Sequence, residues 1–280
     1  MSVTYTIHND DVSTPRRICQ NILNDDETST FLDNGYVIPQ HQLSASHIAE
    51  LSDAVDAMAA ERFPTPQDRS NDRDFAGQYI RDPHKLDPRI LTAALLDVPL
   101  ADTVRCLLGP RIVLRNSNIR LTHPGTGDST VWHTDYRPHT SPPPPLASAP
   151  TVITILIYLD AIDAEVGPLF VVPRSHTRAA QPQPGDGEPD GQLALHLEPG
   201  QVVMMNAALW HRGGPNHSTD RIRRLITLQL STVFMAEFNF ETAFPSPAYQ
   251  RLTEQARARQ DEPLLELLGL GGVNPVSARY

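Results

Sequence analysis

Apolar residues recur at short intervals over the second half of the chain. Gly167-Pro168 and Pro199-Gly200 provide turn signals between apolar segments. Alternation of period two, or a short β-branched run, is typical of strands. Six such segments predict a β-sandwich or barrel: residues 112–121, 152–159, 169–172, 193–197, 202–205 and 225–233.

The first half of the chain shows helical periodicity instead. Ser44 is a good N-cap, and apolar residues from Ile48 to Met58 then recur at helical spacing. A second amphipathic helix is predicted over residues 90–108, and a third over about 248–268. A turn at Asn34-Gly35 precedes a predicted short strand over 36–38. We expect the helices to pack on the sheet.

Polar segments complete the predicted organisation. Residues 1–30 predict an arm or a short helix, and residues 61–89 a surface loop. Residues 141–150 (SPPPPLASAP) predict a stiff extended loop, because proline fixes φ and removes a hydrogen-bond donor. No repeat or domain boundary interrupts the chain. We therefore expect one domain over 1–280, with a sandwich or barrel core over 111–235 and a C-terminal helix and tail over 245–280.

Composition narrows the choice of partners. The 280 residues carry a formal net charge of -10, which disfavours nucleic acid and anionic membranes and favours a small-molecule substrate. The two cysteines, Cys19 and Cys106, exclude a disulfide framework and a cysteine-rich zinc site. The sequence has no signal-peptide pattern and no apolar stretch of membrane-spanning length. These features predict a cytoplasmic monomer or homodimer.

The segment Trp132-His133-Thr134-Asp135 suggests metal binding. His133 and Asp135 stand at positions i and i+2, so both side chains project to the same side of an extended segment. His211, after the predicted strand 202–205, is the best third ligand. Two histidines and one carboxylate on one face of a metal leave three positions open, as in non-haem Fe(II) oxygenases.

The His-x-Asp motif is weak by itself. A second match, His8-Asn9-Asp10, lies in the polar N-terminal segment without a preceding strand, and we treat it as a chance match. A hydrogen-bonded loop pair is the simpler alternative for His133 and Asp135.

A cluster of three arginines near His211 strengthens the case for a site. Arg223 stands twelve residues after His211, at the start of a predicted strand, with Arg221 and Arg224 beside it. An arginine there can form a bidentate salt bridge to a dicarboxylate whose other end chelates the metal. The residues alone leave open which arginine does so, and a solvated basic edge is the alternative.

Four blocks occur in order along the chain. They are Asn34-Gly35-Tyr36-Val37, the motif from Trp132 to Asp135, residues 167–176 (GPLFVVPRSH) and residues 211–224. Together, over about residues 30–240, they resemble the phytanoyl-CoA dioxygenase-like family of Fe(II)/2-oxoglutarate oxygenases. The resemblance implies a mainly β fold with flanking α-helices, the double-stranded β-helix or cupin-like jelly roll. It implies Fe(II), 2-oxoglutarate and O2, with His133, Asp135 and His211 as iron ligands.

The resemblance also assigns residues around the metal. It implies that Arg223 holds the distal carboxylate of 2-oxoglutarate and that Asn116 lies near this cosubstrate. Gly213 departs from the family, which commonly has a small hydroxyl residue there, so one expected hydrogen bond to the cosubstrate is in doubt. Asp135 stands where halogenating relatives have a small residue, which favours hydroxylation, desaturation or ring formation over halogenation.

These observations predict a dioxygenase that oxidises a small amino-acid-like or secondary-metabolite substrate and releases succinate and CO2. Gln78, Arg120 and Arg137 are candidate substrate-binding residues, although a surface or scaffold role is the simpler interpretation of each. Two alternatives remain at this stage. One is a non-catalytic jelly roll that binds a metal or ligand without turnover. The other is a cupin-type metalloenzyme that does not use 2-oxoglutarate.

Overall fold

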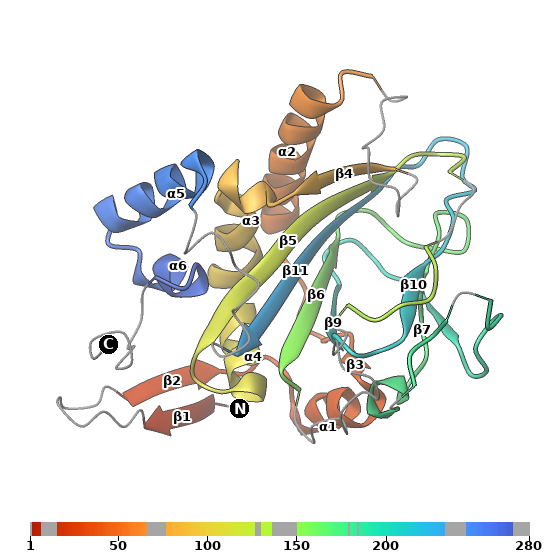
Figure 1. Ribbon diagram of the computed structural model, residues 1–280, viewed down its shortest axis with the longest axis horizontal. Helices are drawn as coiled ribbons and strands as arrows, with labels where there is room; N and C mark the ends of the chain where they lie inside the picture. Colours follow the sequence, from red (N-terminus) through yellow and green to blue (C-terminus); the bar gives the residue numbers. More distant parts are fainter. Residues whose placement is uncertain are drawn as a thin grey trace.

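Two β-sheets dominate the computed structural model, which describes residues 2–6, 16–65, 77–126, 130–135, 150–178, 180–183, 185–232 and 245–270 (Figure 1). The larger sheet is antiparallel, in the order β3-β9-β6-β11-β5-β4. Its strands are β3 (Tyr36–Val37), β4 (Gln78–Arg81), β5 (Ile112–Thr122), β6 (Val152–Tyr158), β9 (Val202–Asn206) and β11 (Arg223–Thr232). The smaller sheet, ordered β10-β7-β8, comprises β7 (Leu169–Val171), β8 (Leu193–Leu195) and β10 (His211–Gly213).

Helices cover one face of the large sheet, and the small sheet lies on its other side (Figure 1). The helices on that face are α2 (Ala45–Arg62), α3 (Arg89–Leu91), α4 (Leu100–Leu108), α5 (Pro247–Ala258) and α6 (Glu262–Leu267). The alternation of β6 explains this layering. Ile153, Ile155 and Ile157 join the core beneath the helices, whereas Leu156 and Tyr158 pack in a second apolar cluster between the sheets.

Several predicted elements are confirmed. All six predicted strands are present, α2 begins after the N-cap Ser44, and α1 (Asp25–Asn34) ends at Gly35 before β3. Gly35 has φ of 82°, and a Cβ atom there would lie 2.8 Å from His176 Cγ, so both the turn and the close packing require glycine.

Other predicted elements are wrong. The single helix over 90–108 divides into α3, a π-helical turn at Thr92–Leu96 and α4, because Pro99 interrupts the hydrogen-bonding pattern. The C-terminal helix divides into α5 and α6 near Gln260, which has φ of 54°. The predicted surface loop 61–89 contains β4 and a short 3-10 turn, Pro83–Lys85.

The N-terminal segment also differs from the expected arm or short helix. It contains the antiparallel strands β1 (Ser2–Thr6) and β2 (Arg16–Gln20), and then α1. The chance match His8-Asn9-Asp10 lies outside the described residues, as does nearly all of the proline-rich segment 141–150.

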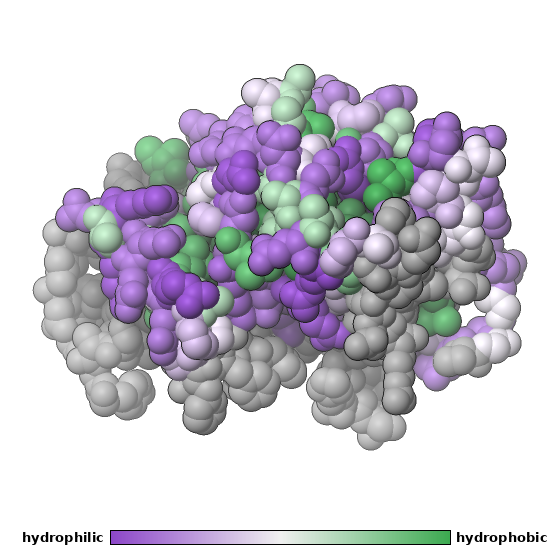
Figure 2. Space-filling model, turned by 90° about the horizontal axis from the view of Figure 1, so that it is seen from above, coloured by the Kyte–Doolittle hydropathy of each residue, from purple (hydrophilic) through white to green (hydrophobic). Residues whose placement is uncertain are grey.

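The described surface is largely hydrophilic in the view of Figure 2, with smaller hydrophobic areas between the polar groups. This distribution agrees with the acidic composition of the chain. Within the described ranges, every helix is too short or too polar to cross a membrane.

Candidate metal centre

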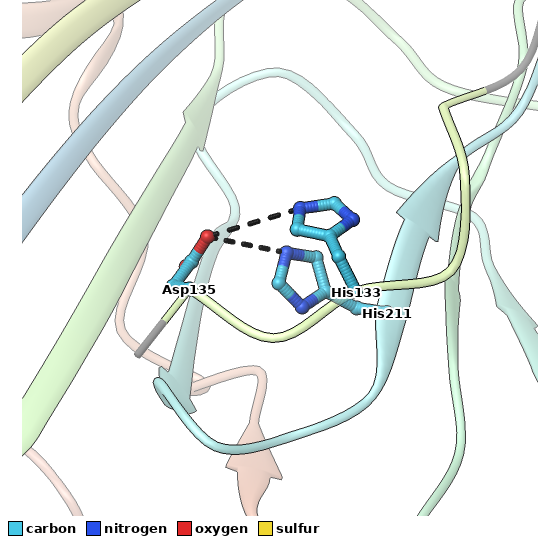
Figure 3. A group of neighbouring side chains, drawn as sticks. All are labelled: His133, Asp135 and His211. Atoms are coloured by element: carbon cyan, nitrogen blue, oxygen red, sulfur yellow. Dashed lines mark ion pairs between the residues drawn. The ribbon is translucent and has the colours of Figure 1, made fainter. Parts of the chain in front are cut away.

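The backbone holds two histidines side by side. His211 begins β10, and His133 forms an isolated antiparallel bridge with it. The His133 N–H donates to the His211 carbonyl oxygen at 3.1 Å, and the His211 N–H donates to the His133 carbonyl oxygen at 3.0 Å. Their ring centroids are 4.2 Å apart, and both rings face Asp135 (Figure 3).

The three side chains have the spacing that a metal ion requires. His133 Nε2 and His211 Nε2 lie 3.9 Å and 3.6 Å from Asp135 Oδ1. Ligand atoms from all three residues lie within 4.8 Å of one another. Since two bonds of about 2.1 Å span up to roughly 4.2 Å, the histidine–aspartate separations suit one shared ion.

Backbone contacts orient the histidine nitrogens for coordination. His133 Nδ1 lies 2.8 Å from the Val131 carbonyl oxygen, and His211 Nδ1 lies 3.0 Å from the Leu209 carbonyl oxygen. A carbonyl oxygen can only accept, so each Nδ1 carries the proton and donates it. Each Nε2 is then the atom with a free lone pair, and both Nε2 atoms face Asp135.

The protonation states also suit a cation. Burial, together with His211, lowers the pKa of His133 to about 3, so its ring is neutral at pH 7. Burial opposes ionisation of Asp135, but His211, His133 and the Thr154 hydroxyl together hold its pKa below the usual value. Thr154 Oγ1 donates to Asp135 Oδ2 at 2.6 Å. The cluster therefore offers a neutral His133 ring and the Asp135 carboxylate, with His211 beside them.

One pocket connects this cluster to Arg223. Side chains from both sheets enclose it, and Leu156, Leu169 and Leu225 supply apolar walls. Its lining residues are Arg120, Thr122, Thr130, His133, Asp135, Leu156, Tyr158, Leu169, His211, Gly213, Arg223, Leu225 and Thr227.

Arg223 is a buried cation whose side-chain hydrogen bonds go to uncharged groups. Its side chain donates to the carbonyl oxygens of Gly167 and Gly214, the latter at 2.8 Å, and to Thr122 Oγ1 at 3.2 Å. Arg223 is only 6% exposed, and among the described residues no carboxylate forms an ion pair with it. Burial lowers its pKa, although an arginine stays protonated at neutral pH. This cation therefore lacks a protein counter-ion within the described structure.

The other two arginines of the cluster have different roles. Arg221 pairs with Asp163 at 2.7 Å and with Glu165 at 2.8 Å on the surface. Arg224 pairs with Asp160 at 2.8 Å and with Asp56 at 2.9 Å. Arg223 is the member of the cluster that lines the pocket. The geometry thus separates three arginines among which the spacing of the residues alone left the choice open.

Of the other residues predicted to bind cosubstrate or substrate, some line the pocket and others do not. Arg120 lines the pocket, with its guanidinium 5.4 Å from the Tyr79 ring centroid. Asn116 is outside the lining and donates to Gln229 Oε1 at 2.7 Å. Gln78 is 3% exposed and its side chain contacts His123 and the Thr65 carbonyl oxygen. Arg137 lies outside the described residues.

Sequence reasoning missed the hydroxyl groups around the site. Thr154 contacts a candidate ligand, Thr122 contacts Arg223, and Thr130 Oγ1 accepts from the Gly213 N–H at 2.7 Å. A signal existed for Thr154, because it is the lone polar residue in the apolar run from Val152 to Ile157. Such a residue in a buried strand needs a hydrogen-bond partner.

Known proteins resemble this chain in sequence or in structure. The dioxygenase af480 of Aspergillus fumigatus is 24% identical over 209 residues, covering 71% of this chain and 64% of that protein. The chain thus spans less than two thirds of that relative's length. EctD from S. alaskensis with bound Fe is 20% identical, with a TM-score of 0.61, over 84% of this chain and 85% of that chain. EvdO2 from Micromonospora carbonacea var. aurantiaca, complexed with 2-oxoglutarate, is 23% identical, with a TM-score of 0.55, over 75% and 91%.

The structural likenesses confirm the predicted fold, a cupin-like jelly roll with flanking helices. The family is shown by the sequence. The sequence model of the phytanoyl-CoA dioxygenase (PhyH) family matches residues 31–225, well over half of the 280 residues. The predicted resemblance is therefore confirmed, and the chain belongs to the phytanoyl-CoA dioxygenase (PhyH) family.

Proposed function

We propose that this protein is an Fe(II)- and 2-oxoglutarate-dependent dioxygenase that acts on a small organic molecule. The observation that carries the proposal is one pocket lined by the three candidate ligands and by Arg223, a buried cation that forms no ion pair with the described residues. Family membership supports it, as does the resemblance to a structure with bound Fe and to another complexed with 2-oxoglutarate. Hydroxylation, desaturation or ring formation on an amino-acid-like or secondary-metabolite substrate is the proposed outcome.

The residues suit the proposed metal and cosubstrate. His133, Asp135 and His211 would hold Fe(II) and leave open positions on its other side. Arg223 would bind the distal carboxylate of 2-oxoglutarate, which would supply a counter-ion that the described part of the chain does not provide. When bound, Fe(II) with 2-oxoglutarate and O2 supplies the oxidising power to break a C–H bond, with succinate and CO2 as coproducts.

The rest of the pocket positions these groups and excludes water. Thr154 fixes one oxygen of Asp135 through its hydrogen bond and leaves Oδ1 directed at the histidines. Leu156, Leu169 and Leu225 supply apolar side chains to the lining that the ligands and Arg223 share. A dry pocket strengthens the attraction between Arg223 and a carboxylate, because there is less solvent to screen it.

The test is turnover of 2-oxoglutarate without added substrate, with succinate measured by mass spectrometry in the presence of Fe(II) and O2. We expect slow succinate formation that His133→Ala and His211→Ala abolish. Arg223→Ala should raise the KM for 2-oxoglutarate about 100-fold, since a bidentate charged contact contributes roughly 3 kcal/mol. Arg221→Ala is the matched control, because Arg221 pairs with surface carboxylates.

Each alternative function has its own signature in this experiment. If the wild type neither binds iron nor forms succinate, the result would favour the non-catalytic jelly roll. Iron binding with an unchanged cosubstrate affinity in Arg223→Ala would show that the assignment of 2-oxoglutarate to this pocket is wrong. It would favour the metalloenzyme that does not use this cosubstrate.

A further inference from the structure

A second cluster of side chains lies behind the candidate metal centre, on the other face of the segments that carry the two histidines. Side chains alternate along β10, so His211 and Gly213 line the pocket and Arg212 points away from it. The antiparallel bridge between His133 and His211 places Trp132 opposite Arg212. Each candidate histidine ligand therefore has a neighbour in the chain that belongs to this second cluster.

Two aromatic rings contact the Arg212 guanidinium. Its central carbon lies 5.1 Å from the Trp132 ring centroid and 4.9 Å from the Phe170 ring centroid. Phe170 is the register partner of Arg212 in the adjacent strand β7 (Figure 1). A cation within about 6 Å of an aromatic ring is attracted to its face, and a planar guanidinium can also stack on it. These contacts attach Arg212 both to β7 and to the segment that carries His133.

Glu188 binds both members of the cross-strand pair. Its Oε1 lies 2.9 Å from Arg212 Nη1, and its Oε2 accepts from Trp132 Nε1 at 3.2 Å. Gln192 donates its Nε2 to the same Oε2 at 3.0 Å and so helps to hold the carboxylate in place. One carboxylate, from the segment between β7 and β8, thus contacts the chain neighbour of each histidine. We call Trp132, Glu188 and Arg212 the clasp.

The clasp restrains a motion that the backbone contacts leave soft. Backbone hydrogen bonds set the spacing of the two segments, from Thr130 to Gly213 and reciprocally between His133 and His211. Paired strands nevertheless twist relative to one another over a range of roughly 10 to 35°. The two imidazole planes now lie at 51°, and both Nε2 atoms face Asp135. A change in twist would alter this angle and both nitrogen–carboxylate distances.

We infer that Glu188 is a positioning residue of the metal centre. By binding Trp132 and Arg212 at once, it fixes the twist of the two segments and hence the directions from which His133 and His211 approach one ion. The inference rests on the proposed function, since it takes these histidines as metal ligands. Groups that orient metal ligands typically change metal affinity 10- to 100-fold. The Glu188 side chain is 54% exposed, and solvent weakens its ion pair, so we expect about tenfold.

The test measures Co(II) binding to the full chain, by competition with a chelator and by the visible absorption bands of the ion. Glu188→Gln keeps the size of the side chain and an acceptor for Trp132, but it removes the ion pair with Arg212. We expect the Kd for Co(II) to rise about tenfold and the absorption bands to change in position or intensity. Trp132→Phe keeps a ring for Arg212 and removes only the N–H donor, so the Kd should rise about threefold. The KM for 2-oxoglutarate in succinate formation with saturating Fe(II) should stay within twofold of the wild type, because Arg223 is untouched.

Glu165→Gln is the matched control, because it breaks an exposed ion pair with Arg221 at 2.8 Å and removes the same charge. It should bind Co(II) as the wild type does. A wild-type Kd and spectrum in Glu188→Gln would overturn the inference. So would an equal rise in Kd in Glu165→Gln, or a raised Kd with an unchanged spectrum in Glu188→Gln, since the effect would then be one of charge alone. Failure of the wild type to bind Co(II) would instead refute the metal centre, and the proposed function with it.

Discussion

Thr154→Val isolates the contribution of one hydrogen bond to metal affinity. Valine matches the shape of threonine and suits a strand, so β6 should keep its packing at a position that is 0% exposed. The change removes the 2.6 Å hydrogen bond to Asp135 Oδ2 and leaves His133 and His211 untouched. Hydrogen bonds to charged groups contribute about 1.5–3 kcal/mol. At about 1.4 kcal/mol per factor of ten, we expect metal affinity to fall roughly 10- to 100-fold.

The assay is competition against a chromophoric chelator, with Co(II) as an air-stable substitute for Fe(II). Thr253→Val is the matched control, because Thr253 is also buried and its hydroxyl donates to the Gln250 carbonyl oxygen of its own helix. Thermal unfolding of both variants checks that the fold is intact. Metal affinity within twofold of the wild type, in a fully folded Thr154→Val protein, would refute the argument that this hydroxyl orients the carboxylate for the metal.

Three further predictions concern cosubstrate binding, stability and pH. A Cβ atom at Gly213 would lie 3.5 Å from Arg223 Nη2, so a serine side chain should fit there. Gly213→Ser should tighten 2-oxoglutarate binding about tenfold, because it adds a hydroxyl beside the cation. Weaker binding by titration calorimetry would contradict this. Glu266→Gln breaks a buried ion pair with Arg105 at 3.1 Å and should lower the free energy of unfolding in urea by about 2–4 kcal/mol, whereas an unchanged value would mean that the pair contributes nothing. Since burial and His211 lower the pKa of His133 to about 3, its ring should stay neutral at pH 5 in the folded, metal-free protein. In the unfolded chain the same ring takes up a proton as pH falls below 6.5, so the free energy of unfolding should fall with pH from that point. An NMR titration midpoint near 6.5 in the folded protein would contradict this.

Periodicity predicted the strands well, because a strand buried on one face alternates apolar and polar residues and a strand buried on both faces is a continuous apolar run. The alternating β5 and the apolar β6 are examples. β4 was missed because Gln78 and Arg81 flank a single fully buried residue, Ile80, and so resemble a loop. Its place in the sheet depends on pairing with β5, which no local pattern encodes. The break before α4 was missed because apolar spacing continues across Pro99.

The candidate site was predictable as a set of residue types and less so as an arrangement. His133, Asp135 and His211 were proposed from spacing and resemblance, and the structure brings their ligand atoms together. The residues alone did not separate Arg221 from Arg223, and only the family resemblance pointed to Arg223. The choice depends on Asp163, which is distant in sequence but binds Arg221. Long-range contacts of this kind decide which charged groups remain available to a ligand.

The backbone bridge between His133 and His211 has a consequence for how the metal centre assembles. Reciprocal hydrogen bonds hold these two segments together without any help from a metal. Two of the three donors are therefore preorganised before the ion arrives, and much of the ordering cost is met during folding. The protein should thus retain its tertiary structure after treatment with a chelator and exchange one divalent ion for another in place, in contrast to small zinc domains, whose folding and metal binding are one event.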